Sequence, residues 1–382
     1  MKAWPKVALG ELLRRADETA VLDPAAEYHE VTIKLWGKGV VGRGKVRGGD
    51  VVTVRRVVRA NQLILSKIDA RNGAIGLVPP ELDGAIVSND FPSFAFRDPE
   101  RCDAAFMGWL VRSAPFVELC KAASEGTTNR VRIKEGRFLD QQIELPPLLD
   151  QQAIVARLDA LAEKTREVEA HLDAVERDAE HLLALRFRDI TADAPLRSMA
   201  EVAPLVRREQ SIDLDGSYPE LGIRSFGKGT FHKPPLSGSE VGTKRLYRIA
   251  PGDLLFSNVF AWEGAIAIAQ PTDAGRFGSH RFITCRAAAH LATAEFLHYY
   301  FLTDEGMLKI GEASPGGAGR NRTLGLEKLM AIEVPVPPLA AQQSFDRLQA
   351  DVAALKARHA AIRQANAALI PATLERVFAG DP

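Results

Sequence analysis

The sequence repeats itself at an offset of about 190 residues. Three aligned pairs of segments mark the repeat: YHEVTIKLWGKG (28–39) with YPELGIRSFGKG (218–229), LILSKI (63–68) with LLFSNV (254–259), and LPPLLDQQ (145–152) with VPPLAAQQ (336–343). Because the offset is nearly constant across so many anchors, the chain is expected to contain two homologous domains and not a solenoid of short units.

Each copy divides into a globular part and a long helix. The predicted divisions are a first globule at 1–145, a first helix at 146–190, a second globule at 191–336 and a second helix at 337–382. Short runs rich in Val, Ile and Leu, punctuated by Gly, predict strands at Val51–Val58, Gln62–Ile68, Ala74–Val78 and Ala85–Ser88. Longer apolar stretches predict packed helices at Ala104–Leu119 and Ala294–Leu302. The expected fold class is α+β, with two homologous α/β globules.

The two long helices are expected to pair with each other. Each follows a Pro-Pro pair, and apolar residues then recur at alternating spacings of four and three, which is typical of a coiled coil. With a globule between them, the helices can run antiparallel. The predicted seam consists of Ile154, Leu158, Leu161, Val168, Leu172, Val175, Leu182, Phe345, Leu348, Val352, Leu355, Ile362 and Leu369. Thr165, His359 and Asn366 are interpreted as polar seam positions that fix the register, and Pro371 is expected to end or kink the second helix.

The net charge of zero conceals opposed local charges. Residues 31–71 contain ten Lys or Arg against two Asp, and residues 221–262 contain six basic against two acidic residues. Residues 150–190 are acidic instead, with ten acidic against six basic residues. The two basic stretches occupy equivalent places in the two copies. This placement favours a polyanionic partner over merely solvated faces.

Several classes of protein are excluded by composition and motif. No run of 18 apolar residues predicts a membrane span, and the first residues do not resemble a signal peptide. Three widely spaced cysteines fit a reducing compartment, so we expect a cytoplasmic protein. No metal-ligand cluster, nucleophile elbow or amino-methylation motif occurs. We therefore expect a chain with no catalytic residues, no bound metal and no cofactor of its own.

A glycine-rich segment in each copy partly resembles a nucleotide-binding loop. GIRSFGKG at 222–229 nearly fits the phosphate-binding loop, but Gly229 stands where Ser or Thr must hold magnesium. The first copy has Thr32 in place of the first glycine. We interpret both segments as turns that bring Lys38 and Lys228 close to a phosphate. A plain β-turn with a solvated lysine is the alternative.

Polar residues beside the shared framework differ between the copies. Arg, Asn and Asp are among them, and these side chains can read base edges in a DNA groove. Two recognition modules for two different DNA sequences would show such differences. Neutral drift on loops is the alternative. The candidate DNA-binding residues are Lys34, Lys38, Arg43, Lys45, Lys67, Arg71, Asn72, Asn89, Arg130, Arg132, Arg224, Lys228, Asn258, Trp262, His280, Arg281, Arg320 and Arg322.

Three segments resemble specificity (S) subunits of type I restriction–modification systems. They are EGTTNRVRIK (125–134) followed by IELPPLLDQQAIV (143–155), PVPPLAAQQ (335–343), and LSKIDARNGAIG (65–76). The resemblance extends over nearly the whole chain, although Ala341 stands where that family has an acid before the Gln pair.

The resemblance implies a subunit without catalysis that grips double-stranded DNA at a bipartite asymmetric target. It also implies docking of two adenine methyltransferase (M) subunits, which bind S-adenosylmethionine. A restriction (R) subunit, driven by ATP and Mg, is a further partner where one exists. Two other classes stay open on the residues alone. One is a coiled-coil scaffold with two protein-binding globules and no DNA contact, and the other is an NTPase, against which Gly229 argues.

Overall fold

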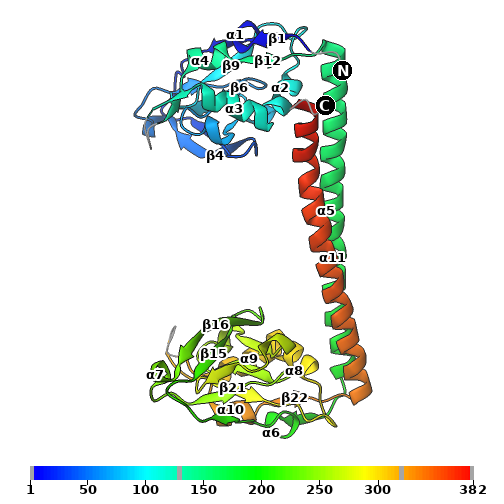
Figure 1. Cartoon of the computed structure of the whole chain (residues 1–382). Helices are drawn as coiled ribbons and strands as arrows, with labels where there is room; N and C mark the ends of the chain where they lie inside the picture. Colours follow the sequence, from blue (N-terminus) through cyan, green and yellow to red (C-terminus); the bar gives the residue numbers. More distant parts are fainter. Residues whose placement is uncertain (1–3, 127–130, 318–321, 379–382) are drawn as a thin grey trace. The chain divides into compact units, whose positions relative to one another are not determined.

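The computed structural model of the chain describes residues 4–126, 131–317 and 322–378. Its contacts divide the chain into two compact units (Figure 1). Unit 1 comprises Met1–Leu172 and His359–Pro382, and unit 2 comprises Asp173–Arg358. Each unit therefore holds one globule, the first part of one long helix and the last part of the other.

Unit 1 is built on two four-stranded sheets. The first has the order β2-β9-β6-β7 and is antiparallel, and the second has the order β4-β3-β8-β5 with a parallel β3–β8 pair. The strands are β1 (Lys6–Ala8), β2 (Leu13–Ala16), β3 (Glu27–Ile33), β4 (Val40–Arg47), β5 (Arg56–Val57), β6 (Leu63–Leu65), β7 (Ile75–Leu77), β8 (Ile86–Val87), β9 (Ser93–Phe96), β10 (Ser124–Glu125), β11 (Arg132–Ile133) and β12 (Gln142–Glu144). The helices are α1 (Leu9–Leu12), α2 (Ala104–Leu110), α3 (Ala114–Ala122), α4 (Glu135–Asp140) and α5 (Leu148–Thr191), with 3-10 turns η1 (Gly48–Asp50), η2 (Ala70–Asn72) and η3 (Pro80–Leu82).

Unit 2 repeats this plan. Its sheets have the orders β14-β17-β20-β15-β16 and β19-β18-β21. The strands are β13 (Leu196–Ser198), β14 (Glu209–Gln210), β15 (Ser217–Ile223), β16 (Thr230–Ser237), β17 (Leu246–Arg248), β18 (Leu254–Ser257), β19 (Ile266–Ile268), β20 (Phe277–Ser279), β21 (Phe282–Cys285) and β22 (Glu333–Pro335). The helices are α6 (Met199–Val202), α7 (Gly238–Val241), α8 (Ala294–Phe301), α9 (Asp304–Glu312), α10 (Leu326–Met330) and α11 (Leu339–Phe378), with 3-10 turns η5 (Ala261–Glu263) and η6 (Pro271–Asp273).

The predicted α+β class is confirmed, but two predicted elements are wrong in detail. Val51–Val58 is a strand only at Arg56–Val57, because Val52 and Val54 are 98% and 60% exposed and have no sheet to cover. The stretch Ala104–Leu119 forms two helices instead of one. Ser113 lies between them as the N-cap of α3, because its hydroxyl accepts a hydrogen bond from the Phe116 amide.

The two long helices pair antiparallel within each unit. In unit 1 the start of α5 meets the end of α11, where Leu158 packs with Leu374 and Asn366 donates to the Thr165 carbonyl at 2.9 Å. In unit 2 the end of α5 meets the start of α11, where the rings of Phe187 and Phe345 lie 5.5 Å apart. Pro371 does not end the second helix, because α11 continues through it to Phe378.

The predicted seam is only partly buried. Leu158, Leu172, Phe345 and Val352 are buried, and Ile154, Leu161, Val175, Leu348 and Leu355 are half-buried. Four predicted positions are wrong, because Val168, Leu182, Ile362 and Leu369 are exposed. The strict 3.5-residue repeat overlooked Leu183, Phe187 and Leu374, which are buried instead. The ends of the long helices turn one face toward a globule as well as toward the partner helix.

Equivalent aromatic contacts join the helix ends to the globules. Phe187 near the end of α5 lies 5.3 Å from Phe296 of α8. Phe378 at the end of α11 lies 5.6 Å from Phe106 of α2. These two contacts are the same contact in the two copies, so each globule is packed against the end of the long helix that belongs to the other copy.

A buried glutamine explains the repeated Pro-Pro…Gln-Gln motif. Gln151 is fully buried; its Oε1 accepts from the Asp103 amide at 2.8 Å, and its Nε2 donates to the carbonyls of Pro146 (2.8 Å) and Arg101 (3.0 Å). Gln342 makes the same three bonds in unit 2, with the Thr293 amide (3.1 Å) and the carbonyls of Pro337 (2.8 Å) and Leu291 (2.9 Å). Each glutamine therefore ties the first turn of a long helix to a helix of its globule.

Replacing Gln151 with Leu is expected to lower the free energy of unfolding by about 3 kcal/mol, because one buried and two part-buried backbone groups lose their hydrogen-bond partner. Urea unfolding measures this loss. Gln152→Leu, at the exposed neighbouring position, is the matched control and should change stability by less than about 0.5 kcal/mol. Equal stability of the two variants would contradict the role of Gln151.

Candidate nucleic-acid interface

The longest hairpin of each globule carries exposed cations. In unit 1, β3 and β4 run antiparallel from the Glu27–Arg47 pair to the Ile33–Val40 pair. Lys34, Lys38 and Arg43 are exposed on this hairpin and, among the described residues, form no ion pair. Lys45 is exposed too, with its Nζ 3.7 Å from Glu27. These side chains leave positive charge on the hairpin for an outside anion.

The second hairpin, β15–β16, shows the same plan with more internal contacts. Lys228 and Arg224 are exposed at its turn. The Arg224 guanidinium donates to the Thr230 carbonyl and lies 5.1 Å from the centre of the Phe231 ring. The Lys228 Nζ lies 5.7 Å from the Phe226 ring. The glycine-rich segment leads into strand β16, not into a helix, so it lacks the geometry of a nucleotide-binding loop.

A loop cluster in unit 1 gathers five more of the predicted residues. The Lys67 amide donates to the Asp90 carbonyl, and the Ile133 amide donates to the Lys67 carbonyl, both at 2.8 Å, which joins three loops. The members that sequence analysis proposed are Lys67, Arg71, Asn72, Asn89 and Arg132. The Arg132 guanidinium lies 2.8 Å from Asp90 and is half exposed.

Not every member of this cluster is available to DNA. The Lys67 Nζ lies 2.8 Å from Glu135, which also pairs with Arg15. The Asn89 side chain accepts from Arg56 at 3.4 Å. The Asn72 amide group points to Asp69, with Nδ2 at 3.4 Å from Oδ1. Lys67 is therefore occupied within the fold, whereas Arg71 forms no ion pair among the described residues.

The equivalent loop cluster in unit 2 contains Asn258, Trp262, His280, Arg281 and Arg322. Asn258 is structural, because its Nδ2 donates to the Leu324 carbonyl at 2.7 Å. The Trp262 indole donates to the Val259 carbonyl at 2.9 Å, and the Arg322 guanidinium lies 5.5 Å from the centre of its ring. His280 and Arg281 are exposed. Arg130 and Arg320 lie outside the described residues.

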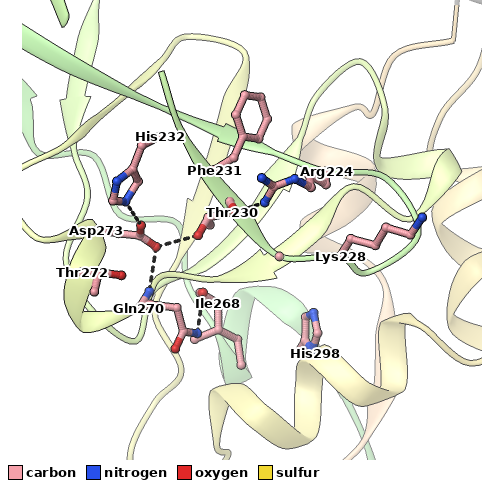
Figure 2. A pocket seen from close by; sticks show the side chains of 11 residues that line it. Arg224, Lys228, Thr230, Phe231, His232, Ile268, Gln270, Thr272, Asp273 and His298 are labelled. Atoms are coloured by element: carbon pink, nitrogen blue, oxygen red, sulfur yellow. Dashed lines mark hydrogen bonds and ion pairs between the residues drawn. The ribbon is translucent and has the colours of Figure 1, made fainter. Parts of the chain in front are cut away.

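A pocket beside the second hairpin contains polar residues that sequence analysis missed (Figure 2). The pocket measures about 720 Å³ and lies against β16, β19 and α8. Asp273 is almost fully buried; its carboxylate accepts from Thr230 Oγ1 at 2.8 Å and from the Gln270 amide at 2.8 Å. It also lies 2.9 Å from Nε2 of His232, whose side chain is 43% exposed. Asp273 thereby fixes the orientation of the His232 ring at the surface.

The corresponding pocket of unit 1 lacks this network. It measures about 370 Å³ and is lined by the Gly37–Lys38–Gly39 turn, β7 and α2. The positions equivalent to Thr230, His232 and Asp273 hold Val40, Gly42 and Leu82, and Val40 and Leu82 belong to an apolar cluster. The same place in the fold is therefore polar in one globule and apolar in the other.

Two of the solved structures that this chain resembles match it over at least 99% of its length. The HsdS subunit from Thermoanaerobacter tengcongensis matches at 23% identity and a TM-score of 0.64, over 100% of this chain and 98% of that one. A chain from a structure on complex assembly and conformational transition of the type I R-M system matches at 23% identity and a TM-score of 0.70, over 99% and 98%. The chain has the HsdS fold. We found no match to it among protein-family models or among curated proteins.

Within the HsdS fold, the buried carboxylate Asp273 makes a pH-dependent contribution to stability. Burial opposes its ionisation, but hydrogen bonds from the Gln270 amide, Thr230 and His232 outweigh burial and lower the pKa of Asp273. A lowered pKa stabilises the folded state above the unfolded pKa of about 4, and that stabilisation is lost as the pH falls through the folded pKa.

Asp273→Asn is accordingly expected to lower the free energy of unfolding by about 2 kcal/mol at pH 7. The difference from the parent chain should shrink as the pH falls below about 4. Chemical unfolding of both chains from pH 7 to pH 3 measures this trend, with exposed Asp215→Asn as the control. A difference that does not depend on pH would show that the charge of Asp273 contributes nothing.

The three cysteines of this HsdS-like chain are buried, and His298 is half-buried. Cys102, Cys120 and Cys285 are unpaired thiols whose pKa burial raises to about 12. Burial also lowers the pKa of the His298 imidazole. Among the residues that the structure describes, no three His, Cys, Asp or Glu side chains are placed to hold a metal ion. In the same ranges no helix is long and apolar enough to cross a membrane.

Proposed function

We propose that this chain is the specificity subunit of a type I restriction–modification complex. The observation that carries the proposal is the agreement of fold with HsdS over at least 98% of both chains. Because the agreement extends from the first globule to the end of α11, it includes both globules and both long helices.

In this proposal each globule binds one half of a bipartite asymmetric DNA target. The exposed cations of the β3–β4 hairpin support this role, since lysine and arginine bind phosphates irrespective of sequence. The difference between the two pockets supports recognition of a different half-site by each globule. Thr230, His232 and Asp273 stand where the first globule has Val40, Gly42 and Leu82. Polar groups in one module and apolar groups in the other select different base edges.

The partners follow from the same proposal. Two adenine methyltransferase subunits would dock on the paired helices and supply catalysis, with S-adenosylmethionine bound by them. A nuclease–translocase subunit using ATP and Mg would join where the genome encodes one. This chain would then contribute recognition and no catalytic step.

Single-molecule sequencing of genomic DNA with and without the gene tests the proposal. We expect N6-methyladenine at one bipartite motif in the parent strain, its loss in the deletion strain and its return on complementation. Unchanged methylation, together with DNA affinity that does not depend on salt, would overturn the proposal in favour of a protein-binding scaffold.

A further inference from the structure

The turn of each long hairpin exposes a large aromatic ring in a strained backbone conformation. Trp36 is 72% exposed and has φ +61°, and Phe226, its equivalent in the other copy, is 74% exposed and has φ +62°. Bulky residues rarely occupy this left-handed region, because Cβ then crowds the following carbonyl oxygen. Both turns therefore store strain at an exposed ring.

The surrounding fold clamps this conformation in place. The Trp36 amide donates to the Asn72 carbonyl at 2.9 Å, and the Phe226 amide donates to the Glu263 carbonyl at 2.8 Å. Gly73 and Gly264 allow this approach, since a Cβ there would lie 3.2–3.3 Å from the Cα of the aromatic residue. A glycine could make the same backbone bonds without strain.

Because both rings are largely exposed, they bury little apolar surface that could offset the strain. Both copies nevertheless keep an aromatic side chain, while the residue before it changes from Leu35 to Ser225. Strain held in place by its surroundings and repeated in two copies is typical of a binding site.

Cations flank both exposed rings. Lys38 and Lys228 follow the rings after one glycine, and the cations Lys34 and Arg224 precede them by two residues. Carboxylates are present as well: Glu263 accepts from Ser225 Oγ at 3.1 Å beside the second turn, and Glu118 and Glu375 line the pocket that Trp36 borders. An exposed ring between cations fits a partner that combines flat apolar faces with negative charge, and nucleic acid is such a partner.

We propose that Trp36 and Phe226 contact DNA bases directly. Each ring opens a base step and stacks on the exposed base, while Lys38 or Lys228 binds the neighbouring phosphate. The inference rests on the proposed function, because it names the residues that engage the DNA of that same interface.

A protein contact is the competing explanation, and the structure gives it a location. Trp36 also borders an open pocket of about 590 Å³ whose far wall is formed by Ile370 and Leu374 of α11. A methyltransferase side chain could enter this pocket. The experiment therefore measures DNA affinity and subunit assembly separately.

The test replaces both rings with glycine, in the full chain co-expressed with its methyltransferase. We expect Trp36→Gly with Phe226→Gly to match or exceed the parent in melting temperature, because glycine relieves the left-handed strain. Affinity for the methylated motif should fall about tenfold per turn, with the salt dependence unchanged because the lysines stay. Trp36→Phe and Phe226→Trp should keep parental affinity. Leu214→Ala, at an equally exposed apolar residue, is the control.

Three outcomes would overturn the inference while leaving the proposed function intact. Parental affinity in the glycine variant would exclude stacking by the rings, and a lowered melting temperature would assign them a structural role. Loss of the methyltransferase from the purified complex, with DNA affinity intact, would make the rings a protein contact. Failure of the parent complex to bind its motif would instead overturn the proposed function, and this inference with it.

Discussion

Reversing the charge of Lys34, Lys38, Arg43 and Lys45 together is expected to weaken DNA binding by on the order of a hundredfold at low salt. Each cation that binds a phosphate contributes about −0.9 to the slope of log K against log salt, so the slope should flatten by up to about 3.6. The large effect follows from the exposure of all four side chains on one hairpin. Titration of labelled DNA at four salt concentrations gives both the affinity and the slope.

The matched control reverses four cations of unit 1 that already pair with carboxylates. These are Arg59 with Glu18, Arg101 with Glu11, Lys121 with Glu118 and Arg137 with Glu125. The control has the same change in net charge, so a general electrostatic effect would weaken both variants equally. An unchanged slope in the hairpin variant would exclude this hairpin from the DNA interface.

Replacing the second globule with a copy of the first is expected to change the methylated target completely. Residues 6–144 would take the place of residues 196–335. Both halves of the new target should then carry the bases that the first globule reads, and methylation of the parental target should fall by at least about a thousandfold. Sequencing of methylated DNA from cells that carry the graft measures both effects.

The junctions of this graft are structurally equivalent. Strand pair β1–β12 closes the first globule with Val7 opposite Ile143, and β13–β22 closes the second with Arg197 opposite Val334. Gln151 and Gln342 then tie the following helices in the same way. The reciprocal graft should read only the other half. A graft that still methylates the parental target would show that the globules do not read separate halves.

The duplication made the fold largely predictable. A constant offset and the Pro-Pro pairs predicted helix segments from 146 and from 337, and the helices α5 and α11 begin at Leu148 and Leu339. The α+β class followed from short Gly-punctuated runs. The failures came where a local pattern lacked its tertiary partner. The valines of 51–54 have strand propensity, but no neighbouring strand covers them, so they remain exposed or loosely packed.

The candidate interface was less predictable. Basic residues on the hairpins were found by counting charge, because their role needs only exposure and sign. Counting could not separate Arg43, exposed on β4, from Lys67, which pairs with Glu135 across the globule. The network of Thr230, His232 and Asp273 gave no local signal, because Asp273 lies more than 40 residues from both Thr230 and His232. Comparison of the two copies at these positions is the signal that could have found it.

By itself the sequence determined that there are two copies of one plan, two long helices of similar length and a basic stretch in each copy. These features depend on repetition, periodicity and charge, which are properties of the chain order. Only the tertiary structure decided that Phe187 and Phe378, near the ends of the two long helices, each pack on the globule of the other copy. It also decided that Leu183 and Leu374 are buried, whereas Leu182 and Leu369 are exposed. It alone also showed the strained exposure of Trp36 and Phe226. The physical reason is that burial and backbone strain depend on what surrounds a residue in space, and a one-dimensional period contains no record of those neighbours.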